Sequence, residues 1–254
     1  PSWWAYKMKY RNVPWFWWRY LMTRPYPDNY TSVGDLVEYG GKHRTTAFNH
    51  ETFRAYLIWR LHRHFECTSF VETGTLYGQT AGFVRRVFKT PVFTSEINRT
   101  YHIVSKANLF WAKRIRLFRS NSPEFLRTVC DESVIGTSPM FYLDAHWYDY
   151  VPLPDELAII AERCEKGIIV IDDFLNPLDP RFRYDDYASL RIDVEAVDSS
   201  LKSRRDDVSV YVPSYAPDRD PTGKGIGYAV VLMGEKKDLP VGTFPFNLLT
   251  KISG

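Results

Sequence analysis

The sequence of 254 residues predicts an α/β fold, in which helices cover both faces of a mostly parallel sheet. After residue 41, segments with helical spacing of apolar residues alternate with short runs rich in β-branched and aromatic residues. Two of these runs, residues 140–143 and 167–171, are almost entirely apolar, as expected of strands that are buried on both faces. Several runs end at an acidic residue, where an open α/β sheet places its ligands.

The predicted elements follow one another in a regular order. Phe53, Leu57 and Leu61 indicate a first helix, and Asn98 is a suitable cap for a helix that we expect to reach about residue 113. Ser122 followed by a proline indicates another helix start. The remaining expected helices cover residues 78–89 and 154–164, and the expected strands cover residues 68–71, 91–95, 114–118, 140–143, 167–171, 208–212 and 227–233, the last two as an antiparallel pair.

Composition narrows the possible classes of function. With 44% hydrophobic and 25% charged residues, the chain can bury one sizeable core, and we expect one main domain over residues 42–254. A net charge of +3 is too small for a dedicated nucleic-acid binder. No apolar run approaches the roughly 20 residues of a transmembrane helix, and no signal peptide is evident, so we expect a soluble protein for which membrane contact is a disfavoured alternative. Cys67, Cys130 and Cys164 are widely spaced, which favours the reducing cytoplasm.

The first 41 residues form a predicted extension that is rich in aromatic and basic side chains, with no acid before Asp28. Such a segment can pack over the main domain, line a ligand cleft or lie in a membrane interface. The sequence is compatible with all three roles. Aromatic residues are also enriched at protein interfaces, so a homo-oligomer is one expectation. The Pro, Asn, Asp, Ser and Gly content of residues 25–41 predicts a loop.

The segment from Glu72 to Gly78 is the first candidate binding turn. Gly74 and Gly78 would let the backbone approach a ligand at the start of the next helix. The spacing differs from the G-x-G-x-x-G of dinucleotide sites, which disfavours NAD and FAD. A tight turn without any ligand is the structural alternative.

Glu96 ends the second expected strand, where a carboxylate can accept hydrogen bonds from ribose hydroxyls. Together, Glu72 and Glu96 suggest an adenosine-containing ligand. A carboxylate at Glu72 would repel a pyrophosphate but balance a cationic amino acid or a sulfonium group, which favours S-adenosylmethionine. Asn121 follows the third strand and would either contact an adenine edge or cap the next helix.

At these positions the chain resembles the class I S-adenosylmethionine-dependent methyltransferases. The motif of residues 70–75 is similar to the family's first motif, and Glu96 stands where its second-strand acid is expected. Residues 141–147, 171–174 and 184–187 resemble a bacterial branch of sugar O-methyltransferases that includes macrocin O-methyltransferase. The resemblance covers about residues 45–235.

This resemblance implies a Rossmann-like, seven-stranded, mostly parallel sheet whose last strand is antiparallel. It also implies methyl transfer from S-adenosylmethionine to a small-molecule or glycan acceptor, with a sugar hydroxyl as the leading choice. The predicted cofactor-binding residues are Glu72, Thr73, Gly74, Thr75, Gly78, Glu96, Asn121 and Asp144.

Acceptor chemistry is expected where the fourth and fifth strands end. Asp144, Asp172 and Asp173 offer hard oxygen ligands for Mg²⁺ or Mn²⁺, which would hold two vicinal hydroxyls and lower the pKa of one. His146 would be the general base, so His146 and Asp144 are the predicted catalytic residues. Nearby aromatic side chains, at positions 147, 148 and 150, would stack on a sugar ring. The alternatives without a function are that Asp144 and Asp172 cap loops or helices and that His146 is a structural histidine.

Three other functions remain open at this stage. A metal-independent methyltransferase would use His146 alone on a phenolic or carboxylate acceptor. A nucleotide-dependent oxidoreductase has a similar fold, although the spacing of the turn and the charge of Glu72 disfavour it. A non-catalytic module would dock its basic aromatic N-terminus on a membrane or a nucleic acid.

Overall fold

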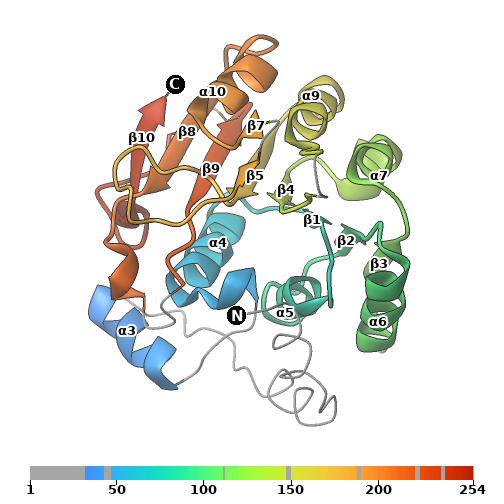
Figure 1. Ribbon diagram of the computed structural model, residues 1–254, viewed down its shortest axis with the longest axis horizontal. Helices are drawn as coiled ribbons and strands as arrows, with labels where there is room; N and C mark the ends of the chain where they lie inside the picture. The colour runs from blue at the N-terminus through green and yellow to red at the C-terminus, as the bar shows by residue number, and fades with distance from the viewer. Residues whose placement is uncertain are drawn as a thin grey trace.

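A sheet of eight strands, in the order β10-β8-β9-β5-β4-β1-β2-β3, runs through the centre of the molecule (Figure 1). The computed structural model describes residues 32–42, 47–110, 112–146, 150–187, 190–220, 224–235 and 238–253. The predictions made for residues 1–31 and for the aromatic residues 147 and 148 lie outside this part of the chain.

The candidate site lies beyond the carboxyl ends of the five parallel strands. Their order reverses between β1 and β4, and the ligand crevice of an open α/β sheet lies at such a reversal, beyond the carboxyl ends of the strands. Thr73 pairs with Ser95 on one side and with Leu143 on the other, so the three strands end at the same level. The parallel strands are β1 (Ser69–Thr73), β2 (Val92–Ser95), β3 (Ile115–Phe118), β4 (Pro139–Leu143) and β5 (Gly167–Asp172).

Three antiparallel pairings complete the sheet. β9 (Tyr228–Met233) pairs with β5 and with β8 (Val208–Pro213), which confirms the expected antiparallel pair. The prediction of seven strands is one too few, because β10 (Leu249–Ser253) adds antiparallel to β8 at the sheet edge. The free hydrogen-bonding groups of an edge strand invite such an addition. A separate two-stranded ribbon joins β6 (Asp186–Tyr187) to β7 (Leu190–Arg191).

Helices cover both faces of the sheet, as predicted (Figure 1). Alternate residues of a strand point to opposite faces of the sheet and pack in two separate hydrophobic cores. Phe70 packs in one core with residues of α4 and α5, whereas Val71 packs in the other with residues of α7 and α9. The α-helices are α3 (Val33–Lys42), α4 (Thr52–His64), α5 (Gln79–Val87), α6 (Arg99–Leu109), α7 (Ser122–Val129), α8 (Glu132–Ile135), α9 (Leu153–Arg163) and α10 (Val194–Val197). The short helical turns are η1 (Phe48–His50), η2 (Asp198–Lys202), η3 (Pro217–Arg219) and η4 (Phe246–Leu248).

Helix caps explain where several helices begin. The Asn98 side chain accepts hydrogen bonds from the backbone of Thr100 at 2.9 Å and of Tyr101 at 3.3 Å, which confirms it as the cap of α6. That helix ends at Leu109, four residues before the predicted end. The expected start at Ser122 is also confirmed, with a proline in the first turn of α7.

Helix α3 occupies part of the segment that was predicted to be a loop. Ser32 and Asp35 exchange hydrogen bonds: the Ser32 backbone donates to the Asp35 carboxylate at 2.9 Å, and the Asp35 backbone donates to the Ser32 hydroxyl at 3.2 Å. This capping box satisfies free donors at the start of the helix, and Leu36 is fully buried in the core. The loop prediction was wrong there because local capping and burial outweigh the glycines of this segment.

Within the described residues, no helix is both long enough and apolar enough to cross a membrane.

Candidate active site

The turn after β1 brings the backbone of two strands into close contact. Gly74 has a φ of +85°, and a Cβ there would lie 2.5 Å from the carbonyl oxygen of Asp144. Gly78 precedes α5 with a φ of +78°, and a Cβ there would lie 2.8 Å from Leu109. Only glycine fits these two positions without strain. The geometry of the turn therefore explains both glycines without a ligand. The role of this turn in binding a cofactor stays a prediction.

Glu72 is buried beneath this turn. The Thr94 hydroxyl donates a hydrogen bond to its carboxylate at 2.6 Å, and Thr75 contacts the same hydroxyl. Burial raises the pKa of Glu72 to about 8, with a smaller contribution from the charge of Glu96, while the bond from Thr94 opposes the rise. A cationic ligand beside Glu72 would stabilise the ionised form.

Glu96 ties the end of β2 to the turn after β1. Its two oxygens accept hydrogen bonds from the backbone of Leu76 and of Asn98, each at 2.8 Å. Burial raises the pKa of Glu96, and these bonds act in the opposite direction. A carboxylate can accept about four hydrogen bonds, so acceptor capacity remains for a ligand. The structure thus brings Glu72 and Glu96 to one turn, as the sequence predicts.

Asn121 caps α7 in the structure. Its side-chain oxygen accepts a hydrogen bond from the backbone of Glu124 at 2.9 Å. The capping alternative is therefore confirmed, and the adenine contact stays a prediction.

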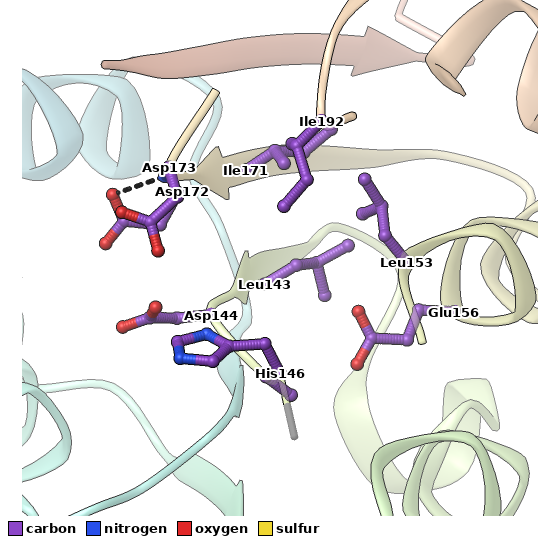
Figure 2. A pocket seen from close by; sticks show the side chains of 10 residues that line it. Leu143, Asp144, His146, Leu153, Glu156, Ile171, Asp172, Asp173 and Ile192 are labelled. Carbon is purple, nitrogen blue, oxygen red and sulfur yellow. Dashed lines mark hydrogen bonds between the residues drawn. The ribbon is translucent and has the colours of Figure 1, made fainter. Parts of the chain in front are cut away.

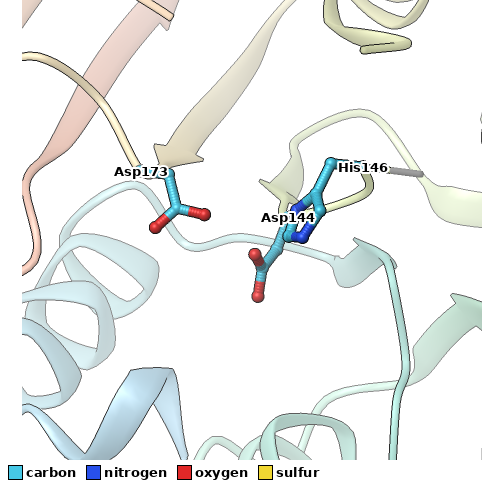
Figure 3. Close-up of side chains that lie close together, drawn as sticks. All are labelled: Asp144, His146 and Asp173. Atoms are coloured by element: carbon cyan, nitrogen blue, oxygen red, sulfur yellow. The ribbon is translucent and has the colours of Figure 1, made fainter. Parts of the chain in front are cut away.

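Asp144, His146 and Asp173 gather beyond the ends of β4 and β5 (Figure 3). Each offers one ligand atom, and these atoms all lie within 4.8 Å of one another. Burial and then the charges of Asp172 and Asp173 raise the pKa of Asp144 well above its usual range. Burial and then Asp172 raise the pKa of Asp173 to about 8. Positive charge placed among these groups would stabilise both ionised carboxylates.

His146 is exposed at the rim of this group. Its ring lies 5.4 Å from the ring of Tyr187, with an angle of 40° between the two planes. Tyr187 in turn donates a hydrogen bond to Asp185 at 3.1 Å. Asp185 and Asp186 are exposed. Tyr150 donates a hydrogen bond to Asp155, and its side chain is also exposed.

Asp172, the third predicted metal ligand, is not part of this gathered group. One of its oxygens accepts from Arg54 and from the backbone of Asp173, and the other accepts from Asn49 and from the hydroxyl of Tyr142. Four donors fill the acceptor capacity of a carboxylate. Asp172 is therefore a buried, neutralised partner of Arg54 in this structure.

Sequence reasoning missed Arg54, although a signal was present. Arg54 shares helical spacing with Leu57, Ile58 and Leu61, so it lies on the buried face of α4, and all four side chains are fully buried. An arginine on an apolar helix face requires a buried acidic partner. The sequence does not show which acid serves, because Asp172 is 118 residues away.

Glu156 is the second residue that sequence reasoning missed. It projects from the first turn of α9 into a small pocket that Asp144, His146 and Asp173 also line (Figure 2). Burial raises its pKa to about 7, against the lowering influence of the Ser122 and Thr73 hydroxyls. The Ser122 and Thr73 hydroxyls reach this carboxyl, although among the described residues none makes a hydrogen bond of normal geometry to its Oε1 atom. Asp155 and Glu156 together look like the ordinary acidic first turn of a helix, so the sequence gave no sign that one of them is buried.

Comparison with known proteins identifies the fold. No protein-family model matches the sequence, and no curated protein matches it. The structure is similar to that of an O-methyltransferase from Bacillus cereus in complex with SAH, with a TM-score of 0.50, 13% identity, and coverage of 79% of this chain and 90% of that chain. It is also similar to the O-methyltransferase TomG from Streptomyces achromogenes, which is involved in tomaymycin synthesis and was solved with SAM. That likeness has a TM-score of 0.52, 16% identity, and coverage of 88% of this chain and 97% of that chain. The chain shares the Rossmann-like fold of these two proteins.

The raised pKa of Glu72 predicts a pH dependence of stability. Between the ordinary value of 4.5 and about 8, the unfolded chain loses the proton of Glu72 while the folded chain keeps it. The free energy of unfolding therefore falls with rising pH in this window, by up to about 1.4 kcal/mol per pH unit. We expect Glu72→Gln to remove this part of the decline, so that the variant gains stability relative to the wild type from pH 5 to 8.

Urea unfolding measures the free energy of unfolding of the wild type and of Glu72→Gln across this pH range. Taking the difference between the two proteins cancels the contributions of the other buried acids. Thr94→Val is a control that removes the hydrogen bond but keeps the titrating group. Parallel stability curves for wild type and Glu72→Gln would show that Glu72 is ionised in the folded chain.

Proposed function

We propose that the protein is an S-adenosylmethionine-dependent O-methyltransferase that acts on a sugar hydroxyl of a glycoside or glycan. The observation that carries the proposal is the pair Glu72 and Glu96, which meet at a glycine turn beside the reversal of strand order. The shared fold with the Bacillus cereus and Streptomyces achromogenes proteins, solved with SAH and SAM, supports it.

On the cofactor side, each residue supplies a different kind of contact. Glu96 offers remaining lone pairs to ribose hydroxyls, and the backbone at Gly74 permits close approach of a ligand. Glu72 supplies negative charge toward a sulfonium or an amino group once the ligand stabilises its ionised form. A pyrophosphate in the same place would be repelled by this charge.

On the acceptor side, the side chains must orient a hydroxyl and take up its proton. Methyl transfer requires an in-line approach of oxygen to the methyl carbon while the bond from carbon to sulfur breaks. Beyond the strand ends, next to the turn after β1, lie Asp144, His146 and Asp173. The backbone N–H of Asp144 donates a hydrogen bond of 3.2 Å to the carbonyl oxygen of Thr73. These oxygen and nitrogen donors fit a divalent cation, which when bound would lower the pKa of a hydroxyl held against it.

The choice of a sugar acceptor rests on the resemblance of residues 141–147 and 171–174 to the sugar O-methyltransferase branch. The exposed imidazole of His146 and the half-buried carboxyl of Asp173 provide polar contacts for neighbouring hydroxyls at the mouth of the site. Tyr187 stands beside His146 with an aromatic ring that a sugar face could contact.

Calorimetric titration with S-adenosylmethionine and S-adenosylhomocysteine tests the cofactor. We expect micromolar binding of both by the wild-type chain and a loss of about tenfold or more in Glu96→Ala, because a charged acceptor of hydrogen bonds is removed. Glu132→Ala, which removes an exposed glutamate of α8, is the matched control and should bind as the wild type does. Failure of the folded wild type to bind either compound would refute the proposal, and binding of NAD instead would restore the oxidoreductase alternative.

Transfer of a labelled methyl group tests the acceptor class. Methyl glycosides with two vicinal hydroxyls should be methylated, and the matched deoxy glycosides should react at least about tenfold more slowly because one polar contact is left unmade. Methylation of a simple phenol with no transfer to any glycoside would contradict the sugar assignment while leaving the methyltransferase assignment intact.

A further inference from the structure

Positive charge is concentrated in one continuous stretch of the chain. Between Glu72 and Glu124 the sequence holds nine Lys and Arg residues and a single acid, Glu96, which is buried in the structure. Because the whole chain has a net charge of only +3, the rest of it is net negative. The stretch contains α5, β2, α6 and β3, and β3 is the edge strand at the opposite end of the sheet from β10.

The outer face of α6 combines cations with exposed apolar side chains. Arg99, Ile103, Lys106 and Phe110 follow one another at intervals of four, three and four residues, so they lie along one face of the helix. All four are exposed, and the exposed fractions of Ile103 and Phe110 are 56% and 83%. Leu109 packs in the core on the other face. This face of α6 therefore leaves two large apolar side chains in contact with water, between cations.

The turn between α6 and β3 adds two more cations. The backbone of Ala112 donates a hydrogen bond to the carbonyl oxygen of Leu109 at 2.9 Å, so the chain turns back directly after the helix. The Arg85 side chain donates to the carbonyl oxygen of Lys113 at 2.6 Å, which holds the turn against α5. The side chains of Lys113 and Arg114 are exposed. We call the following residues the α6 patch: Arg99, Ile103, Lys106, Phe110, Lys113 and Arg114.

Within the described part of the chain, none of the four cations of the α6 patch forms an ion pair with an acid. The resulting positive field acts on His102, which lies in the same helix. Burial, and then the charges of Lys106 and Arg119, lower the pKa of His102 below its usual range. The α6 patch therefore attracts anions and repels a second copy of itself.

We infer that the α6 patch docks the protein on the surface of an anionic lipid bilayer, with Ile103 and Phe110 inserted among the headgroups and the four cations beside the lipid phosphates. Each Lys or Arg held near such a surface strengthens binding about fivefold. The inference changes the expectation, drawn from the sequence, that membrane contact is disfavoured. That expectation concerned spanning helices, whereas a helix that lies in the interface needs only one face of apolar and basic residues.

The apolar members of the α6 patch favour a lipid surface over a nucleic acid. Single-stranded nucleic acids bind in basic grooves where aromatic rings stack on the bases. Ile103 has no ring to stack, and α6 lies beside β3 at the outer edge of the molecule (Figure 1). An interfacial helix, in contrast, buries its apolar side chains at the boundary between headgroups and acyl chains.

Flotation of the full chain with phosphatidylcholine vesicles, with and without phosphatidylserine, tests the inference. The wild type should bind the vesicles that contain phosphatidylserine, and added salt should weaken binding. The double variant Lys106→Gln/Lys113→Gln should bind about tenfold more weakly or worse, because two charges leave the surface. Phe110→Ser should also lose about tenfold, because an apolar side chain no longer leaves water on binding.

Matched controls separate the α6 patch from a general effect of charge or hydrophobicity. The double variant Arg204→Gln/Lys251→Gln removes the same charge from exposed positions before β8 and on β10, and it should bind as the wild type does. Leu178→Ser removes another exposed apolar side chain, also with no expected effect. On the wild type itself, hydrogen exchange should slow in α6 and not in β10 when vesicles with phosphatidylserine are added.

Three results would overturn the inference: no binding of the wild type to vesicles with phosphatidylserine, equal binding to vesicles without it, or unchanged binding by the folded variants of the α6 patch. Binding of a single-stranded oligonucleotide without binding to vesicles would assign the patch to a nucleic acid instead. Docking does not depend on the proposed methyl transfer, so failure of cofactor binding and failure of vesicle binding are separate results.

Discussion

The buried ion pair between Arg54 and Asp172 is the interaction on which the arrangement of the site depends. Arg54 projects from α4, is fully buried, and joins the last residue of β5 to the backbone carbonyl of Ile226 and to Glu51, 3.2 Å away. Its guanidinium also lies 4.6 Å from the ring centre of Tyr228. One side chain thus joins a helix, a parallel strand and the segment that leads into β9. A charge in this position must be fully paired, because an unpaired buried charge would be very costly.

The ion pair between Arg54 and Asp172 gives the two adjacent aspartates at the end of β5 different surroundings. Asp172 is held in the core, and Asp173 turns outward beside Asp144 and His146. Asp144 is held in turn by the backbone of Thr73 and by its contact with Gly74, which places the group of Asp144, His146 and Asp173 against the turn after β1. Glu96 accepts a hydrogen bond from the backbone of Leu76 in the same turn, and Glu72 accepts one from the Thr94 hydroxyl. The spacing between these two groups of residues is therefore set by backbone contacts rather than by flexible side chains.

Much of this arrangement could be predicted from the sequence, because it depends on strand ends. Apolar runs located the five parallel strands, and an acid after a strand must lie at the common edge of a parallel sheet. The partners of those acids could not be predicted, since the pair of Arg54 and Asp172 joins residues far apart in the chain. The eighth strand was missed because residues 249–253 are short and carry only a weak alternation. Helix α3 was missed although Ser32 and Asp35 have the spacing of a capping box.

The most direct measurement compares Asp172→Asn with Asp173→Asn, each for its free energy of unfolding and its affinity for Mn²⁺. We expect Asp172→Asn to lose about 3–5 kcal/mol of stability, because the buried Arg54 then keeps only Glu51 as a carboxylate partner, and we expect the folded variant still to bind Mn²⁺. Asp173→Asn should keep or gain stability, because it relieves repulsion among the carboxylates, and should lose Mn²⁺ binding. The opposite pattern, with binding lost at Asp172 and stability lost at Asp173, would contradict the division of tasks between these two aspartates.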